Sequence, residues 1–492
     1  MAVKDSAVLA LKDFKELAGT STEDGEEISL NEVLERSRKH CVPFPVQTAR
    51  LHHLLNMNSS YRQLRAANGQ EFTESVAQSY INSAYPIIHE DLLPLLLAFL
   101  NYKKKSTQRI ERTFYKDKTV FYLINRLIKN RPIAFLTMND SYLLSNGRTG
   151  QGGFVSIGKD NDKSDWNSFH DLTLEELMSY DEMKLAALLG VSSHSPFINK
   201  GERQNAGTPG KGDHELDGVI IGQVGARFEM FGRMDWQDCV VYEKQNTEKN
   251  GYGKEGKGLQ SDILKAWAKL WGLEYLPTFT EVNGTTSDDY KKHKYQTNTY
   301  FNNKIYKARI QIMAEVLLIE ASSRSKQTQK KAYIHVVGLG LGVWQTDHSQ
   351  PKLFIDAWAN AIDNMPPTVT DNISHIDFSW IPQNKIKSVQ SGGKYPNTDI
   401  VVVFSKRNLH DKVPKDCLLV CNYAWDSNSS PGNEYWLGSL TASGDPAAAC
   451  SSSIAELHNH RINRRVDAAH LRIATRLHGV VTVPQYLQLQ HQ

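Results

Sequence analysis

Residues 417–436 read CLLVCNYAWDSNSSPGNEYW. The first part of this stretch, Cys417 to Val420, is apolar and predicts a buried strand. The remainder is crowded with Asn, Ser and Gly, carries one Asp and one Glu, and is bounded by two Trp, which predicts a polar loop at the end of the strand. Such polar groups are costly to desolvate unless a partner satisfies them. A ligand rich in hydroxyls and phosphates would supply those partners.

A second predicted strand ends in alternating glycines. Residues 334–344 read IHVVGLGLGVW, with Gly338, Gly340 and Gly342 at the carboxyl end. Glycine lets backbone N–H groups approach an anion closely and form a concave nest for phosphate. Two such strand ends, side by side in an α/β sheet, would form a nucleotide cleft. The run matches neither the Walker A motif nor the Rossmann fingerprint, and a tight turn without a ligand is the alternative interpretation.

Composition excludes several classes of protein. The 492 residues exceed one typical core, so we expect two domains or one enlarged domain. The net charge of +3, from 57 basic and 54 acidic residues, gives no field that points to nucleic acid. The five Cys are scattered, which favours a reducing compartment. The longest apolar run, residues 92–100, is too short for a membrane span, and the first residues lack the apolar region of a signal peptide. We therefore expect a cytoplasmic protein.

The pattern along the chain predicts three regions. Residues 1–27 are acidic and rich in Ser, Thr and Gly, and we expect them to be frayed. Apolar residues recur every three or four positions over 28–135, which predicts a helical N-terminal region without strands. From 136 to 480 strands alternate with helices, which predicts an α/β sandwich with a mixed or parallel sheet and loop insertions. Helices are also expected over 172–190 and 461–477, and a short strand over 152–158.

Four acids are candidates for catalysis. Asp426 and Glu434 lie in the polar loop, Asp347 follows the glycine run, and Asp356 lies on a predicted helix. Paired carboxylates suit glycosidic chemistry, because one activates water while the negative field stabilises positive charge at the anomeric carbon. The structural alternatives are an Asx-turn for Asp426, a surface ion pair for Glu434 and a solvated helix face for Asp356. Asp445 is interpreted as the N-cap of a helix.

A charged pair follows another predicted strand. Residues 224–229 read VGARFE, which places Arg227 and Glu229 at a strand end. They form either an internal ion pair or a contact to substrate, Arg227 with a phosphate and Glu229 with a guanidinium. The 17 His form no HExxH or HxH pattern, so no metal is expected.

The chain resembles the divergent macrodomain family of the Legionella effector MavL and its eukaryotic relatives. The matching segments are INKGERQNAG (198–207), GVIIGQVGARFE (218–229), HVVGLGLGVW (335–344), LFIDAWANAI (353–362) and the long run 422–459. The resemblance covers roughly residues 140–460. Two macrodomain features are missing, namely the Asn-Ala-Ala-Asn motif and the triple-glycine run, and the glycine loop precedes the ribose loop rather than following it.

This resemblance implies a macrodomain-like three-layer α-β-α sandwich that binds ADP-ribose, needs no cofactor and removes ADP-ribose from modified arginine. It implies an ADP-ribosylated protein, with ubiquitin as one candidate, as the partner, and the host cytosol as the location of a secreted effector. It places Asp347 and Asp356 where the family's aspartates fall. The expected contacts to ADP-ribose are Gly338, Leu339, Gly340, Leu341, Gly342, Val343, Trp344, Asp377, Asn422, Ser430, Gly432 and Asn433.

Three functions are compatible with such a cleft. The first is an ADP-ribosylarginine hydrolase that uses the carboxylates named above. The second is a macrodomain that reads ADP-ribose without turnover. The third is a transferase that uses NAD, which the absence of a Rossmann fingerprint disfavours. The density of acids around the loops favours the hydrolase.

Overall fold

The computed structural model describes residues 28–136, 139–159, 172–293, 298–426 and 428–490. The predicted frayed segment 1–27 lies outside these ranges. None of the helices within them has both the length and the apolar composition that a membrane crossing requires.

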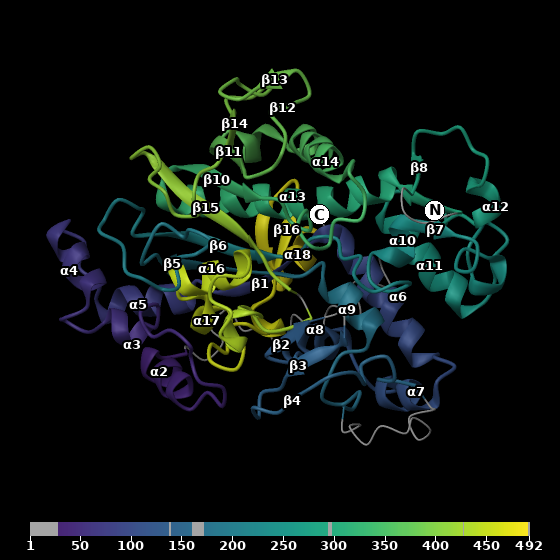
Figure 1. The fold of residues 1–492 in the computed structure, drawn as a ribbon, viewed down its shortest axis with the longest axis horizontal. Coiled ribbons are helices and arrows are strands. Elements are labelled where there is room, and N and C mark those ends of the chain that lie inside the picture. Colours follow the sequence, from purple (N-terminus) through teal and green to yellow (C-terminus); the bar gives the residue numbers. More distant parts are fainter. Residues whose placement is uncertain (1–27, 137–138, 160–171, 294–297, 427, 491–492) are drawn as a thin grey trace.

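A nine-stranded mixed sheet organises the molecule (Figure 1). The order of its strands is β14-β11-β10-β15-β6-β5-β1-β16-β17. In that order the strands span Val401–Ser405, Ile373–Ser379, Lys331–Val337, Cys417–Ala424, Asp217–Gln223, Gly190–Pro196, Tyr85–His89, Arg472–Thr475 and Gly479–Thr482. The two strands predicted before the glycine run and before the polar loop are confirmed, since they correspond to β10 and β15.

Strand direction brings distant loops to one edge of the sheet. β14, β11, β10, β15 and β6 are mutually parallel, so their carboxyl ends meet at the same edge. β5 runs antiparallel to both β6 and β1, while β16 runs parallel to β1 and antiparallel to β17. The predicted mixed sheet is therefore confirmed.

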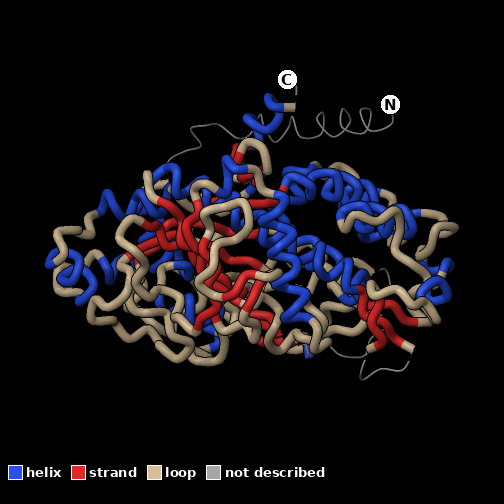
Figure 2. Tube along the Cα trace, turned by 90° about the horizontal axis from the view of Figure 1, so that it is seen from above, coloured by secondary structure: helices blue, strands red, loops and turns tan. Residues whose placement is uncertain are grey.

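Helices cover both faces of the sheet. Consecutive side chains on a strand point to opposite faces, and on β5 Ser192 donates to Glu320 of α13 (Asn303–Thr328) whereas Ser193 contacts His458, which follows α17 (Ile454–Leu457). α13 is buried along most of its length and lies against one face, and α16 (Gly444–Ser451) and α17 lie against the other. In the tube view of Figure 2 most strands lie together near the middle of the molecule, and helices lie around them.

The N-terminal region is built from short capped helices. Ser29, Thr73 and Thr119 each accept a hydrogen bond from the first turn of the helix that follows, which satisfies donors that would otherwise lack a partner. The helices are α2 (Leu30–Arg38), α3 (Leu51–Leu54), α4 (Ser60–Ala67), α5 (Glu74–Asn82), α6 (Leu93–Lys104), α7 (Arg109–Tyr115) and α8 (Val120–Lys129), with the 3-10 turn η1 (Glu90–Leu92) before α6. A later helix, α9 (Tyr180–Ala186), packs against α8.

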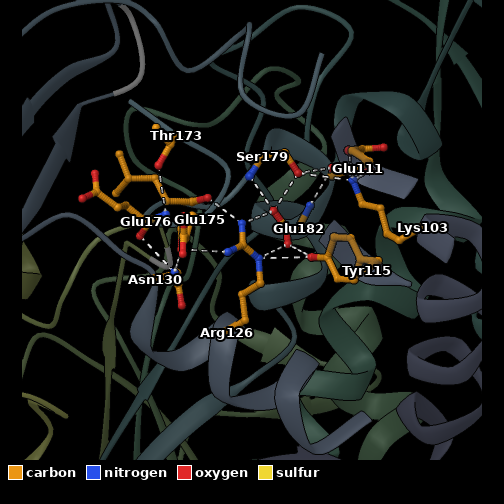
Figure 3. Close-up of polar contacts among 12 residues, drawn as sticks. Lys103, Glu111, Tyr115, Arg126, Asn130, Thr173, Glu175, Glu176, Ser179 and Glu182 are labelled. Carbon is orange, nitrogen blue, oxygen red and sulfur yellow. Dashed lines mark hydrogen bonds and ion pairs between the residues drawn. The ribbon is translucent and has the colours of Figure 1, made fainter. Parts of the chain in front are cut away.

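A buried polar network joins α6, α7, α8 and α9 (Figure 3). Arg126 of α8 pairs with Glu182 of α9, and Glu182 also accepts hydrogen bonds from Ser179 and Tyr115. Lys103 of α6 pairs with Glu111 of α7 and with Asp181. Because buried charges are stable only when paired and hydrogen-bonded, these contacts hold the four helices in one arrangement.

A smaller unit is inserted between β6 and β10. It contains the sheet β7-β9-β8 and precedes α13. Its elements are α10 (Trp236–Cys239), β7 (Val240–Tyr242), η3 (Glu248–Asn250), α11 (Leu259–Leu270), α12 (Phe279–Val282), β8 (Tyr290–Lys292) and β9 (Thr299–Asn302). The remaining elements are β2 (Ala134–Leu136), β3 (Ser141–Leu143), β4 (Thr149–Gly150), α14 (Gln350–Asn364), α15 (Pro367–Thr370), β12 (Lys385–Ile386), β13 (Val389–Gln390), η4 (Tyr435–Leu437), η5 (Ala468–His470) and α18 (Val483–Leu489).

Three local predictions are wrong. The N-terminal region contains a strand, because Tyr85–His89 is β1 and lies between β5 and β16, so the sheet crosses the predicted boundary at residue 135. The helix predicted over 172–190 is limited to α9, and residues 154–158 form turns instead of a strand.

The helix predicted over 461–477 is also absent. The side chains of Asn459, Asn463 and Asp467 accept hydrogen bonds from backbone N–H groups two residues further on. Such Asx-turns compete with the helical pattern. The segment then enters the sheet as β16, which pairs with β1 and β17.

Candidate functional site

Three loops meet at the carboxyl edge of the sheet. The glycine run 338–344 follows β10, the polar loop 425–436 follows β15, and residues 224–229 follow β6. β15 lies between the other two strands, and the backbone N–H of Val337 donates to the Asn422 side chain at 2.8 Å. The expectation that segments 338–344 and 422–434 start from neighbouring strand ends is confirmed.

The glycine run packs against the segment after β6. Gly340 has φ +74°, a left-handed conformation that favours glycine. A Cβ on Gly225 would lie 2.3 Å from the backbone N of Gly340, and a Cβ on Gly340 would lie 2.7 Å from the carbonyl O of Ala226. Glycine is therefore required at both positions for the two backbones to approach. Leu339 and Trp344 are buried, whereas Val343 is 88% exposed.

Arg227 lies between these loops. Its guanidinium carbon lies 4.2 Å from the centre of the Trp344 ring, and its Nη2 donates to Glu229 at 3.2 Å. The backbone N–H of Arg227 donates to Asp235 at 2.8 Å, which fixes the segment. The Nε and Nη1 atoms are buried and have no hydrogen-bond partner among the described residues. Two donors on a positively charged group therefore lack a partner in the described chain.

The polar loop brings two more carboxylates, Asp426 and Glu434, to the same place, and α16 brings a third, Asp445. Asp426 accepts a hydrogen bond from Asn433 at 2.6 Å, and Asn433 in turn accepts one from the backbone of Phe135 at 2.6 Å. Asp445 of α16 accepts the backbone N–H of Gly432 at 3.0 Å. Within the described part of the chain, one buried oxygen of Glu434 (Oε2) and one of Asp445 (Oδ2) have no hydrogen-bond partner.

Burial and mutual repulsion change the acidity of this cluster. The pKa of Asp426 is raised to about 6, chiefly by burial; Arg227 opposes the rise, whereas Glu229 and Glu434 add to it. The pKa of Asp445 is raised well above its ordinary value by burial and then by negative Asp426. At neutral pH Asp426 is therefore mostly ionised, while burial and negative Asp426 both favour the protonated form of Asp445. Such separated acidities are typical of acid–base sites.

Other predicted ligand contacts border this cluster. Asn422 Nδ2 and Ser430 Oγ are buried and, in the ranges described, make no hydrogen bond. Gly432 has φ +83°, and its ordered turn positions the following Asn433. These groups provide further unused polar atoms beside the loop.

Asp347 and Asp356 make their hydrogen bonds and ion pairs with residues outside the carboxylate cluster. Asp347 is 5% exposed and accepts hydrogen bonds from Lys291 at 2.9 Å and from the backbone and hydroxyl of Ser349 at 2.8 and 2.5 Å. Burial raises its pKa, but the bonds from Ser349 and Lys291 outweigh burial and lower it overall. Asp356 lies on α14 and pairs with Lys352 at 2.7 Å.

Asp377 lies at the end of β11 and is buried. Its two oxygens accept hydrogen bonds from Tyr333 at 2.8 Å, Ser379 at 3.0 Å and Ser405 at 2.6 Å. Trp380, which follows β11, is 64% exposed and has φ +60°. An exposed aromatic ring on a strained backbone is a feature of binding sites, and the sequence alone offers no sign of it.

The interpretation of Asp445 as an N-cap is wrong. The N-cap of α16 is Ser443, and Asp445 lies in the first turn and binds Gly432 of another loop. Because Asp445 stands between Gly444 and Pro446, a role at the start of a helix explained it fully from the sequence. Its contact with the carboxylate cluster was therefore missed. The one available signal was a third acid soon after Asp426 and Glu434.

Comparisons with known proteins agree with this arrangement. The family model "ADP-ribosylhydrolase MavL-like" matches residues 31–489. Two proteins of Drosophila melanogaster, each named as an ADP-ribosylarginine hydrolase, are 37% identical over 417 residues and 35% identical over 420 residues. Each alignment covers 82% of this chain, together with 81% and 82% of the respective relative. The predicted resemblance is confirmed, and the chain belongs to the MavL-like ADP-ribosylhydrolase family.

Proposed function

We propose that this protein is an ADP-ribosylarginine hydrolase with a macrodomain-like fold. The observation that supports this most is the group of four carboxylates, Glu229, Asp426, Glu434 and Asp445, around Arg227 at the carboxyl edge of the sheet. A single site thus presents unused donors for phosphate and unused acceptors for a guanidinium. The names of the two relatives support the arginine linkage.

ADP-ribose would lie across the ends of β11, β10 and β15. Its diphosphate would bind backbone N–H groups of 338–344 and the free Nε and Nη1 atoms of Arg227, since a guanidinium binds phosphate oxygens in pairs. The distal ribose would lie against residues 426–434. The adenine would extend toward β11, where Trp380 offers an exposed ring.

The substrate arginine would be held by carboxylate. A guanidinium presents a planar fork of donors that matches a carboxylate, and Glu434 has a free buried oxygen. Asp445 accepts from Gly432 through Oδ1, and its Oδ2, which has no partner in the described chain, would bind a ribose hydroxyl. The negative field of the cluster also stabilises the positive charge that develops at the anomeric carbon.

In the reaction, water attacks the anomeric carbon of the distal ribose. A carbon–oxygen bond forms as the carbon–nitrogen bond to the guanidinium breaks. Asp426 accepts the proton that water loses, because its pKa of about 6 leaves it ionised yet basic near neutral pH. The guanidine leaves as a neutral group and then takes up that proton, so charge and atoms balance. No cofactor enters this scheme.

The substrate is a protein that carries ADP-ribose on arginine, and ubiquitin is the candidate that the family resemblance suggests. A cytoplasmic location would give access to such proteins. Asp347 and Asp356 would support the fold, because their carboxylates are engaged by Lys291, Ser349 and Lys352.

The test is release of ADP-ribose from matched proteins modified on arginine, glutamate or serine. We expect release from the arginine conjugate alone, and a loss of at least a hundredfold in D426N and E434Q. D356N, which removes a carboxylate paired with Lys352, is the matched control and should keep its rate within twofold. Tight binding of ADP-ribose without release from any conjugate would instead identify a reader of ADP-ribose.

A further inference from the structure

A recess lies at the opposite edge of the sheet from the candidate site. Its volume is about 450 Å³, and Tyr85, His194, Arg324, Gln327 and Arg472 are part of its lining. Tyr85 begins β1 and Arg472 begins β16. β1 runs in the same direction as β6, since both are antiparallel to β5. The amino ends of β1 and β16 therefore face away from the carboxyl edge that carries Arg227.

Two arginines are held on one aromatic ring in this recess. The guanidinium carbons of Arg324 and Arg472 lie 4.4 and 5.3 Å from the centre of the Tyr85 ring. Tyr85 also donates its hydroxyl to Glu320 at 3.0 Å, which fixes the ring. The two cations are thereby held in place before any ligand arrives.

The two arginines differ in how their charge is balanced. Arg324 pairs with Glu320 at 2.7 Å and donates to the carbonyl of Ser83 at 2.8 Å. Arg472 forms no ion pair with a carboxylate of the described chain, and its guanidinium donates long hydrogen bonds to the carbonyls of His470 and Leu471 at 3.4 and 3.5 Å. The recess thus holds one guanidinium whose charge is not neutralised.

The other groups that face the recess do not supply a counter-charge. Burial, and then positive Arg324, lower the pKa of His194 to about 4, so this ring is neutral at pH 7 and offers one N–H donor. Burial lowers the pKa of Arg472, and Arg324 lowers it further. Glu320 is fully buried and already engaged by Arg324, Tyr85 and Ser192. The recess therefore keeps a net positive charge.

We infer that this recess is a separate binding site for a small molecule that carries a phosphate monoester. The fork of Arg472 would bind two phosphate oxygens, with His194 as a further donor. The volume exceeds that of a bare phosphate and lies in the range of small-molecule sites. Ser79, Asn82 and Gln327 would then contact the rest of the molecule. This inference is independent of the proposed hydrolase activity.

The experiment is calorimetric titration of the whole 492-residue chain with inorganic phosphate. Because phosphate also suits the proposed diphosphate site, the titration starts from R227M, which removes the free donors there. We expect R227M to bind phosphate and R227M/R472M to bind it at least tenfold more weakly. Equal affinity of these two proteins, or no binding by R227M, would overturn the inference.

A second variant separates loss of the site from loss of the fold. Gln327 is exposed at the rim, so Q327E adds a negative charge without disturbing the core. In the R227M background it should weaken phosphate binding several-fold, while R38M, which removes an exposed arginine elsewhere, should not change it. Acetate tests the class of ligand: binding as tight as that of phosphate would contradict a phosphate site.

Discussion

Asp426 depends on its neighbours for its chemistry. Its pKa of about 6 results from burial, which Arg227 opposes and Glu229 and Glu434 reinforce. A raised carboxyl pKa means that the folded state favours the protonated form, so this group contributes stability below its ordinary pKa of 3.8 and loses it as pH rises through 6. The base of the reaction, however, must be ionised. Activity at this site therefore comes at some cost in stability.

The pH dependence of the rate follows from this value. If Asp426 takes the proton from water, log(kcat/KM) for arginine-linked ADP-ribose should rise with unit slope up to about pH 6 and then level off. Steady-state kinetics between pH 4.5 and 8 measure it. A rate that stays flat through pH 6 would contradict the role of Asp426 as base.

Asp445 joins two elements through one hydrogen bond. In D445A the backbone N–H of Gly432 loses its buried acceptor, and we expect a loss of about 1–3 kcal/mol in the free energy of unfolding. D445N keeps an acceptor of the same shape, and because burial raises the pKa of Asp445 and so disfavours its charged form, this variant should stay within about 0.5 kcal/mol of wild type. Urea unfolding distinguishes them. Equal losses in both variants would contradict the expectation that an uncharged acceptor suffices at this position.

At the scale of elements, the close approach of two loops builds the site. G225A and G340A would each place a methyl group against backbone that cannot move aside. We expect each to lose about 1–3 kcal/mol of stability and to raise KM, because the glycine run would be displaced. G342A is the matched control for stability, since a Cβ at Gly342 meets nothing within 4 Å. Thermal unfolding measures the stability of the three variants. Equal losses of stability in all three would contradict the close contact between the backbones at Gly225 and Gly340.

Prediction of elements from sequence succeeded where burial in the core determines both the apolar pattern and the structure. The apolar runs of β10, β11 and β15 are buried strands because their side chains pack on both faces. The pattern was misleading at 461–477, where helical spacing of apolar residues hides three Asx-turns. Local competition between side chain and backbone for hydrogen bonds leaves no trace in hydrophobic periodicity.

At the scale of the whole molecule, the order of strands in the sheet could not be predicted from the sequence. β1 comes from the predicted helical region and yet pairs with β16, near the other end of the chain. The local pattern of apolar residues does not indicate which distant strand will pair with a given strand. The same holds for the site: Arg227, Asp426 and Glu434 were predicted as candidates, but Asp445 and Trp380 matter only through neighbours that the fold supplies.

The buried network of Figure 3 should dominate the stability of the N-terminal helices. The pKa of Glu182 is lowered to about 2: burial raises it, but Arg126 outweighs burial. Its stabilisation is thus present above its ordinary pKa of 4.5 and is lost as pH falls toward 2. In E182Q, buried Arg126 loses its partner, and we expect a loss of about 3–5 kcal/mol at pH 7.

Chemical unfolding at pH 7 and at acidic pH measures this loss. D399N, which breaks the exposed pair with Lys394, is the matched control and should cost less than about 1 kcal/mol. Losses of equal size in E182Q and D399N would be inconsistent with a buried network that holds α6 to α9 together.

The measurement that tests the central claim most directly is a crystal structure of D426N with ADP-ribose bound. The diphosphate should contact the backbone of 338–344 and the Nε and Nη1 atoms of Arg227, with the distal ribose within hydrogen-bond distance of Glu434 and Asp445. ADP-ribose bound away from this edge, for example in the roughly 340 Å³ cavity lined by Tyr180 and Trp267, would contradict the account.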